Sequence, residues 1–168
     1  LPKSIRIGAA DSFALTYLSS LLERLAELHP EIHVDLEVGF SATLDRKLQA
    51  GELDIAFITQ PTDNASVRIE PVLDVEVAWM ASPKLGLHEQ PVAPADLCRH
   101  IILTNPHPSY LYGTMQDWFG GSVVPRRLHT CTSLMFAAKL TADGVGIAIL
   151  PLIVARRDLA RGQLVVLE

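Results

Sequence analysis

Ala50-Gly51-Glu52-Leu53-Asp54-Ile55-Ala56-Phe57-Ile58 joins a predicted helix end to a predicted strand. Leu44 and Leu48 have helical spacing, and Gly51 suits the left-handed position just past a helix end. Residues 53–58 form a short apolar run with one charge, which predicts a strand buried on both faces. The pattern returns later, where Asp143-Gly144-Val145 precedes the apolar residues 146–150. This repetition predicts two similar α/β units.

Working outward, the first half reads strand, helix, strand, helix, strand. We expect strands at residues 4–9, 33–39 and 53–58, with a helix at 42–50. Asp11 or Ser12 is the expected cap of a long first helix. That helix carries a leucine stripe and is stopped by Pro30; the stripe is Leu15, Leu18, Leu21, Leu22, Leu25 and Leu28. Short connections between these elements predict a parallel sheet with right-handed crossovers.

The second half repeats the alternation after an extended passage at residues 67–81 and a surface loop at 82–94. A helical turn is expected at 94–97. Further strands are expected at residues 100–103, 127–131, 146–150 and 164–167. The expected helices are residues 110–119, a segment capped by Thr132 and Ser133, and a segment that starts at Pro151 and runs to about residue 160.

Composition limits the classes of function. The chain has 168 residues, 49% of them apolar, which supplies a core for one large domain or two small lobes. No apolar run approaches the roughly 20 residues of a membrane helix, and we expect a cytoplasmic protein. The formal charge of −5 argues against direct nucleic-acid binding by this segment. Cys98 and Cys131 are expected to be buried free thiols in a reducing compartment, with a redox switch as the alternative.

Motifs for catalysis are missing. There is no phosphate-binding loop of the Gly-x-x-x-x-Gly-Lys type and no Gly-x-Ser-x-Gly elbow. His29 and His33 are four residues apart, but Pro30 breaks the helix that a metal pair at this spacing needs. We therefore predict no catalytic residue, no metal site and no cofactor, which disfavours a hydrolase or a transferase.

Polar residues recur just past the carboxyl end of each expected parallel strand. The set is Asp11, Ser12, Phe40, Ser41, Thr59, Gln60, Thr104, Asn105, Thr132 and Ser133, in which Phe40 is the apolar member. Ligands of open parallel sheets bind outside the carboxyl ends of strands. Hydroxyls and helix N-termini without a fixed cation suit a small anion such as a carboxylate. The alternative is that each Ser or Thr only caps its helix.

An ordered set of motifs resembles one known family. The set comprises residues 5–8, the leucine-rich helix ending at His29-Pro30, Leu48-x-x-Gly51-x-Leu53-Asp54-Ile55-Ala56 and Gly144-x-Gly146-Ile147-Ala148-x-Leu150-Pro151. It resembles the effector-binding domain of LysR-type transcriptional regulators from residue 5 to about 167. The resemblance implies two Rossmann-like lobes joined by crossing strands, as in type 2 periplasmic binding proteins, with a small-molecule co-inducer between them.

The same resemblance implies the domain organisation. Lobe I is expected at residues 1–74, a crossover strand at 75–80, lobe II at 81–163 and the start of a return crossover at 164–168. It also implies an N-terminal winged helix-turn-helix that reads DNA and a C-terminal piece of lobe I, both outside this chain. Because the chain lacks an initiator Met, we expect a fragment or a processed protein.

The resemblance finally implies a mechanism and partners. Ser12, Ser41, Thr59, Thr104 and Asn105 fall on the family's ligand loops, whereas Phe40 stands where a small polar residue is usual. Effector binding is expected to shift the lobes within a homodimer or homotetramer, paired through the first helix and second strand. The alternative is a free-standing solute-binding protein of a transport system, whose gene would encode a signal peptide upstream.

Overall fold

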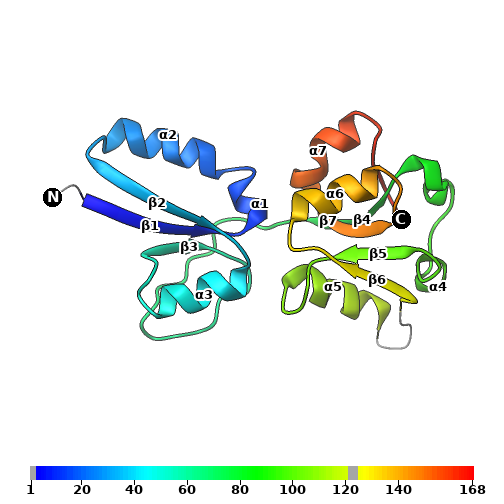
Figure 1. Cartoon of the computed structure of the whole chain (residues 1–168), viewed down its shortest axis with the longest axis horizontal. Helices are drawn as coiled ribbons and strands as arrows, with labels where there is room; N and C mark the ends of the chain where they lie inside the picture. Colours follow the sequence, from blue (N-terminus) through cyan, green and yellow to red (C-terminus); the bar gives the residue numbers. More distant parts are fainter. Residues whose placement is uncertain (1–2, 121–124) are drawn as a thin grey trace. The chain divides into compact units, whose positions relative to one another are not determined.

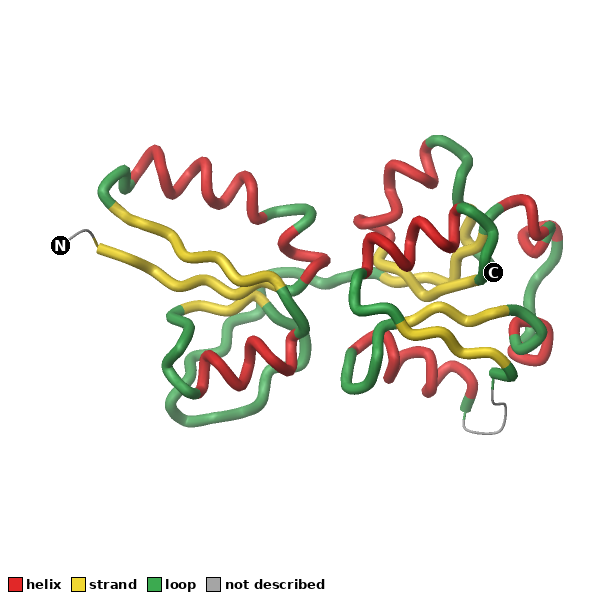
Figure 2. Tube along the Cα trace, in the orientation of Figure 1, coloured by secondary structure: helices red, strands yellow, loops and turns green. Residues whose placement is uncertain are grey.

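The computed structural model describes residues 3–120 and 125–168. The chain divides into two compact units, one reaching Asp74 and the other starting at Val75. Both are α/β, as Figures 1 and 2 show. The α/β fold predicted from the repeated pattern is confirmed. No helix in residues 3–120 or 125–168 is long and apolar enough to cross a membrane.

The first unit is a three-stranded parallel sheet with the strand order β2-β1-β3. Its strands are β1 (Lys3–Ala9), β2 (Ile32–Val38) and β3 (Ile55–Phe57). Its helices are α1 (Asp11–Ala14), α2 (Leu18–Leu28) and α3 (Ser41–Gln49). Figure 1 shows α2 and α3 on opposite sides of the sheet, as right-handed crossovers to either side of β1 require.

The predicted long first helix is wrong, because the structure breaks it into α1 and α2. Between them, the Thr16 hydroxyl donates to the Ser12 carbonyl at 2.5 Å. Such local side-chain bonds compete with continued helix. Leu15 lies in this break and is exposed, so it leaves the predicted leucine stripe.

The first copy of the apolar strand was predicted to be buried on both faces, and this is also wrong. The Ile55 side chain in β3 is 41% exposed. Strand β3 pairs with β1 over only three residues and lies at the edge of its sheet. An edge strand lacks the second neighbour that would cover it.

The second unit has a five-stranded mixed sheet of order β6-β5-β7-β4-β8. The strands are β4 (Val77–Ala81), β5 (Ile101–Thr104), β6 (Arg127–Thr130), β7 (Ile147–Pro151) and β8 (Val165–Val166). β5 is parallel to β6 and β7, whereas β4 is antiparallel to β7 and β8. Strand β4 therefore belongs to this sheet, although it overlaps the segment predicted to be a crossover.

The helices of this unit are α4 (Pro94–Leu97), α5 (Tyr110–Phe119), α6 (Leu134–Ala142) and α7 (Leu152–Ala160), with short 3-10 turns at Pro83–Leu85 and Leu87–Glu89. α5 ends at Gly120, which has a left-handed φ of 62°. Pro151 was predicted to be the first residue of the last helix, and this is wrong. It is the final residue of β7 and the N-cap of α7.

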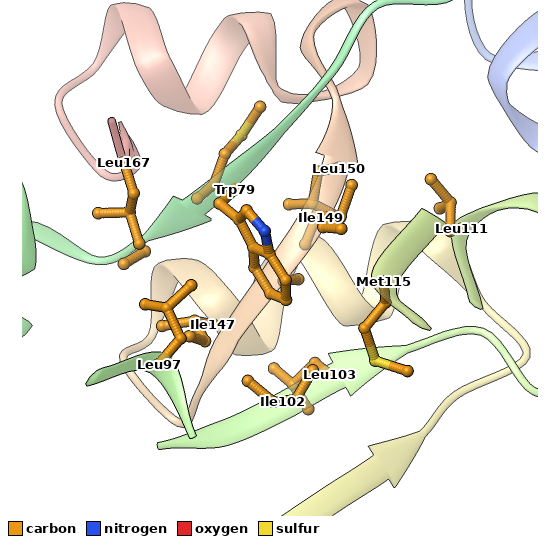
Figure 3. Close-up of a cluster of buried hydrophobic side chains, with 14 of the residues drawn as sticks. Trp79, Leu97, Ile102, Leu103, Leu111, Met115, Ile147, Ile149, Leu150 and Leu167 are labelled. Atoms are coloured by element: carbon orange, nitrogen blue, oxygen red, sulfur yellow. The ribbon is translucent and has the colours of Figure 1, made fainter. Parts of the chain in front are cut away.

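The core of the second unit forms around β7 (Figure 3). All five residues of β7 are buried, and Trp79 of β4 packs edge-on against Trp118 and Phe119 of α5. Gly146 permits the close approach of β5, since a Cβ there would lie 2.5 Å from the Ile101 carbonyl oxygen. The second copy of the repeated pattern thus forms the buried strand that the sequence predicted.

Candidate functional site

The first unit has a topological switch point between β1 and β3, because the chain leaves β1 toward β2 and then returns to β1's other side. Ligands of open α/β sheets bind outside the carboxyl ends of strands at such a point. Residues 10–12 follow β1 here, and residues 58–60 follow β3. Four of the predicted site residues therefore lie in these two segments: Asp11, Ser12, Thr59 and Gln60.

Ser41 and Thr59 form a hydroxyl pair at this edge. Ser41 Oγ lies 3.1 Å from Thr59 Oγ1 and accepts a hydrogen bond from the Thr59 backbone N–H at 3.0 Å. Ser41 is the first residue of α3, whose N-cap is Phe40 without a side-chain cap bond. The capping alternative therefore fails for Ser41. Two hydroxyls carry two protons and their mutual bond uses one, so the pair retains a proton to donate to a ligand.

Gln60 follows with a left-handed backbone conformation, φ 51°. Among residues 3–120 and 125–168 it is the one non-glycine residue with a positive φ. Non-glycine residues in this region cost free energy and are concentrated at functional sites. The Gln60 side chain is exposed, as a ligand contact requires.

An aromatic cluster beside this edge was missed by the sequence analysis. The rings of Phe13 in α1 and Phe57 in β3 stack 4.0 Å apart at an interplanar angle of 4°. The Tyr17 ring lies 5.7 Å from Phe13. The sequence did carry a signal for this cluster, because Phe57 lies near the end of the predicted strand, two residues before Thr59. The cluster gives the edge an apolar component.

Asp11 and Ser12 were predicted as caps of the first helix, and this is wrong. Both lie inside α1, whose N-cap is Ala10 with no side-chain cap bond. α1 has only four residues, so few peptide dipoles add at its N-terminus. The expected anion-binding helix end is therefore weak at this position.

In the second unit, the corresponding residues lie at the carboxyl ends of β5 and β6. Thr104 was predicted to follow its strand but is the last residue of β5. Asn105 comes directly after it, and both residues are buried. The Asn105 side-chain amide donates to the Cys131 carbonyl at 2.8 Å, and the Cys131 N–H donates to the Thr104 carbonyl at 2.8 Å. These bonds hold the ends of β5 and β6 together, so the Asn105 side chain has a structural role.

Ser133 caps its helix, which confirms the capping alternative for this residue. It is the N-cap of α6, and its Oγ accepts from the Phe136 N–H at 3.2 Å. Thr132 is exposed beside it. Cys131 and Cys98 are both free thiols. Cys98 is buried, which raises its pKa, but Cys131 is only half-buried, so the prediction of a buried thiol is wrong for Cys131.

Charge is distributed unequally between the two ends of the sheets. The three residues that follow each of β1, β2, β3, β5, β6 and β7 include no Lys or Arg. At the amino end of β3, Arg6 instead makes a two-pronged contact with Asp54, with N–O distances of 2.8 Å and 3.1 Å. These bonds lower the pKa of Asp54 to about 2 and raise that of Arg6. The segments that directly follow these strands therefore supply no Lys or Arg to recognise a phosphate.

Within the described parts of the chain, no group of three or more His, Cys, Asp or Glu side chains is placed to hold an ion.

Residues 2–168 match the family model described as LysR substrate binding domain. The chain belongs to the LysR substrate-binding domain family. The predicted recognition is thereby confirmed, and with it the effector-binding class of domain. Like its structural neighbours, this LysR substrate-binding domain combines two α/β units.

Among curated proteins, the chain is 24% identical over 171 residues to the HTH-type transcriptional regulator CysL of Bacillus subtilis, which covers 98% of the chain and 56% of CysL. It is 22% identical to MetR of Escherichia coli over 148 residues, covering 88% of the chain and 47% of MetR. This LysR domain thus spans about half the length of the curated relatives it matches.

Two solved structures show the same fold. The regulatory domain of CcmR from Synechocystis PCC6803, in complex with 2-PG, aligns with a TM-score of 0.84 and 20% identity over 98% of this chain and 80% of that one. The C-terminal domains of a LysR family protein from Agrobacterium tumefaciens align with a TM-score of 0.83 and 20% identity, covering 99% and 81%.

Proposed function

We propose that this domain senses a small organic anion for a DNA-binding LysR-type transcription regulator. The observation that carries the proposal is the Ser41–Thr59 hydroxyl pair at a sheet edge where the segments that follow the strands contain no Lys or Arg. The relatives CysL and MetR are transcriptional regulators by name, which supports the whole-protein role. DNA binding is assigned to a helix-turn-helix outside this chain.

The charge distribution favours an effector with a single negative charge. A phosphate ester carries more charge and is usually bound by Arg or Lys forks. The edges of this domain offer hydroxyls, an amide side chain and the aromatic cluster Phe13, Phe57 and Tyr17. Hydroxyls and backbone N–H groups suffice for a carboxylate, and the aromatic rings suit an apolar remainder of the same molecule.

Each unit carries candidate effector contacts on its own sheet edge: Thr59 and Gln60 in the first unit, and Thr104 and Thr132 in the second. An effector with a higher affinity for one conformation of the domain shifts the population toward it. Within an oligomer, that shift changes the spacing of attached DNA-binding modules.

Self-association of the domain is the second part of the proposal, as a homodimer or homotetramer in the cytoplasm. The first unit exposes apolar side chains on α2 and on β2, namely Leu28, Leu36 and Val38. Contiguous exposed apolar residues mark interaction sites. Light scattering on the Leu36→Lys/Val38→Lys variant is expected to give a smaller mass than the wild type.

The effector proposal is tested by a thermal-shift screen of a metabolite library, followed by calorimetry. A ligand that binds only the folded domain raises its melting temperature. We expect each of the variants Ser41→Ala, Thr59→Val and Thr104→Val to bind the stabilising acid about five-fold more weakly. Each variant loses about the free energy of one hydrogen bond. Ser20→Ala, at an exposed position of α2, is the matched control. Unchanged affinity in all three variants would place the site elsewhere.

A further inference from the structure

A polar ladder joins helix α3 to the loop that follows β3. Ser41, Asp45 and Gln49 are spaced by four residues and therefore lie on one face of α3. Each bonds to the segment between Thr59 and Asn64. Ser41 Oγ accepts from the Thr59 N–H, Asp45 Oδ2 accepts from the Thr62 N–H at 3.3 Å, and Gln49 Oε1 accepts from Asn64 Nδ2 at 3.3 Å.

Asp45 is the centre of this ladder. Its side chain is only 7% exposed, and its Oδ2 accepts from Gln49 Nε2 at 3.0 Å as well as from Thr62. Within residues 3–120 and 125–168, no Lys or Arg side chain forms an ion pair with it. Burying a carboxylate without a cation is costly. Apolar packing would hold α3 at lower cost, so the carboxylate points to a role beyond packing.

The loop depends on these side chains because it has no regular structure. Thr59, Thr62 and Ser66 donate their backbone N–H groups to side-chain oxygens, the last to Asn64 Oδ1 at 2.9 Å. Buried or half-buried N–H groups must find such acceptors. The same segment carries Thr59 and the strained Gln60.

We propose that Asp45 is a positioning residue for the effector site. It holds the loop through Thr62 and Gln49, and thereby fixes Thr59 and Gln60 in the conformation that meets the ligand. Asp45 does not itself touch the effector. The inference rests on the proposed function, because it needs Thr59 to be a ligand contact.

The direction of each hydrogen bond makes the proposal testable. Asp45 only accepts, so Gln49 donates to it and keeps its oxygen for Asn64. Asp45→Leu removes the oxygen that accepts from both Gln49 and Thr62 and puts a side chain of similar shape in its place. Asp45→Asn is the conservative variant. Because both bonds end on the single Oδ2 atom, the amide oxygen of an Asn can take its place and keep them.

The test uses amide hydrogen exchange by NMR and titration with the monocarboxylates acetate, pyruvate and lactate, followed at the Thr59 amide. Asp45→Leu is expected to speed exchange at Thr59, Thr62 and Ser66 about ten-fold, and to weaken the response to the probe that binds about five-fold. Asp45→Asn is expected to keep both near their wild-type values. Asp63→Asn removes an exposed carboxylate from the same loop and is expected to change neither.

Two results overturn the positioning role. One is unchanged exchange in Asp45→Leu. The other is faster exchange with an unaltered probe affinity, which makes the ladder purely structural. If no monocarboxylate shifts Thr59 in the wild type, the site proposal fails and takes the positioning role with it. The exchange rates then show that the ladder exists without serving a ligand, so the two failures are distinguishable.

Discussion

Strands β3 and β7 begin from the same sequence pattern and end in different environments. Both follow a helix and a glycine in the left-handed region, Gly51 at φ 72° and Gly144 at φ 86°. β7 has neighbours on both sides, parallel β5 and antiparallel β4, and all five of its residues are buried. β3 has β1 on one side, three paired residues and an exposed Ile55.

The difference teaches that an apolar run predicts a strand but not its number of neighbours. In the second unit, β7 is the central strand of a five-stranded sheet, and its buried side chains form part of the hydrophobic core. In the first unit, β3 is short and its end passes directly into the loop held by α3. The same pattern therefore serves a core in one unit and a site-bearing edge in the other.

The largest expected contrast between the two strands is in truncation to alanine. Leu150 is fully buried in β7, and Leu150→Ala is expected to lower the free energy of unfolding by about 2–5 kcal/mol. Ile55→Ala in β3 is expected to cost less than about 1 kcal/mol, because Ile55 is exposed. Urea unfolding measures both. Trp79 and Trp118, the chain's two tryptophans, report the second unit by fluorescence, and circular dichroism reports the whole domain. Equal costs would contradict the contrast.

The glycines of the two junctions give the next largest effect. Gly146→Ala is expected to cost about 3 kcal/mol, since its Cβ would press on the Ile101 carbonyl, which the β5–β7 pairing holds in place. Gly51→Ala meets open space and is expected to cost about 1 kcal/mol, for the left-handed backbone alone. Thermal unfolding compares them. Gly51→Asn is the control, because Asn tolerates this conformation better than Ala; a larger loss for Asn than for Ala would refute the backbone explanation.

The smallest effect concerns the amino end of β3, where Asp54 binds Arg6. The Asp54 pKa falls from its usual 3.8 to about 2 in the folded state. Its stabilising contribution is therefore complete above pH 3.8 and is lost as the pH falls toward 2. Asp54→Asn is expected to lower the melting temperature at pH 7, and the difference from the wild type is expected to vanish near pH 2.

Arg6→Gln and the double variant Arg6→Gln/Asp54→Asn complete a thermodynamic cycle for this pair. The double variant is expected to show the same weak pH dependence as Asp54→Asn. Arg6→Gln keeps the hydrogen bond from the backbone N–H of residue 6 to Asp54, and is expected to keep part of the wild-type pH dependence. A difference between Asp54→Asn and the wild type that persists unchanged to pH 2 would mean that the Arg6 contact is not its source.

Much of the fold was predictable from local patterns. Periodicity and glycine placement located most strands to within a few residues, and α5 at residues 110–119 was predicted at its observed bounds. The break between α1 and α2 was not predictable, because the leucine stripe favours one continuous helix and the hydrogen bond from the Thr16 hydroxyl to Ser12 competes with it. The exposure of Ile55 was also hidden, since the number of neighbouring strands is a property of the whole chain.

The candidate site was predictable in position more than in detail. Parallel strands predict a polar edge, and Ser41 and Thr59 do pair there. The roles of individual residues depend on contacts far apart in sequence. Asn105 bonds to Cys131, 26 positions away, and Asp45 bonds to Thr62, 17 positions away. Spacing along the chain carries no signal for such bonds, so Asp45 was missed entirely.

Hydrogen exchange with and without the acid that most stabilises the domain tests the central claim, that the carboxyl ends of the sheets bind the effector. The account predicts slower exchange in peptides containing Thr59 and Gln60 and in those containing Thr104 and Asn105. Peptides containing Arg6, in the middle of β1, and Asp54, just before β3, should be unchanged. Protection at Arg6 and Asp54 without protection at Thr59 would contradict the account.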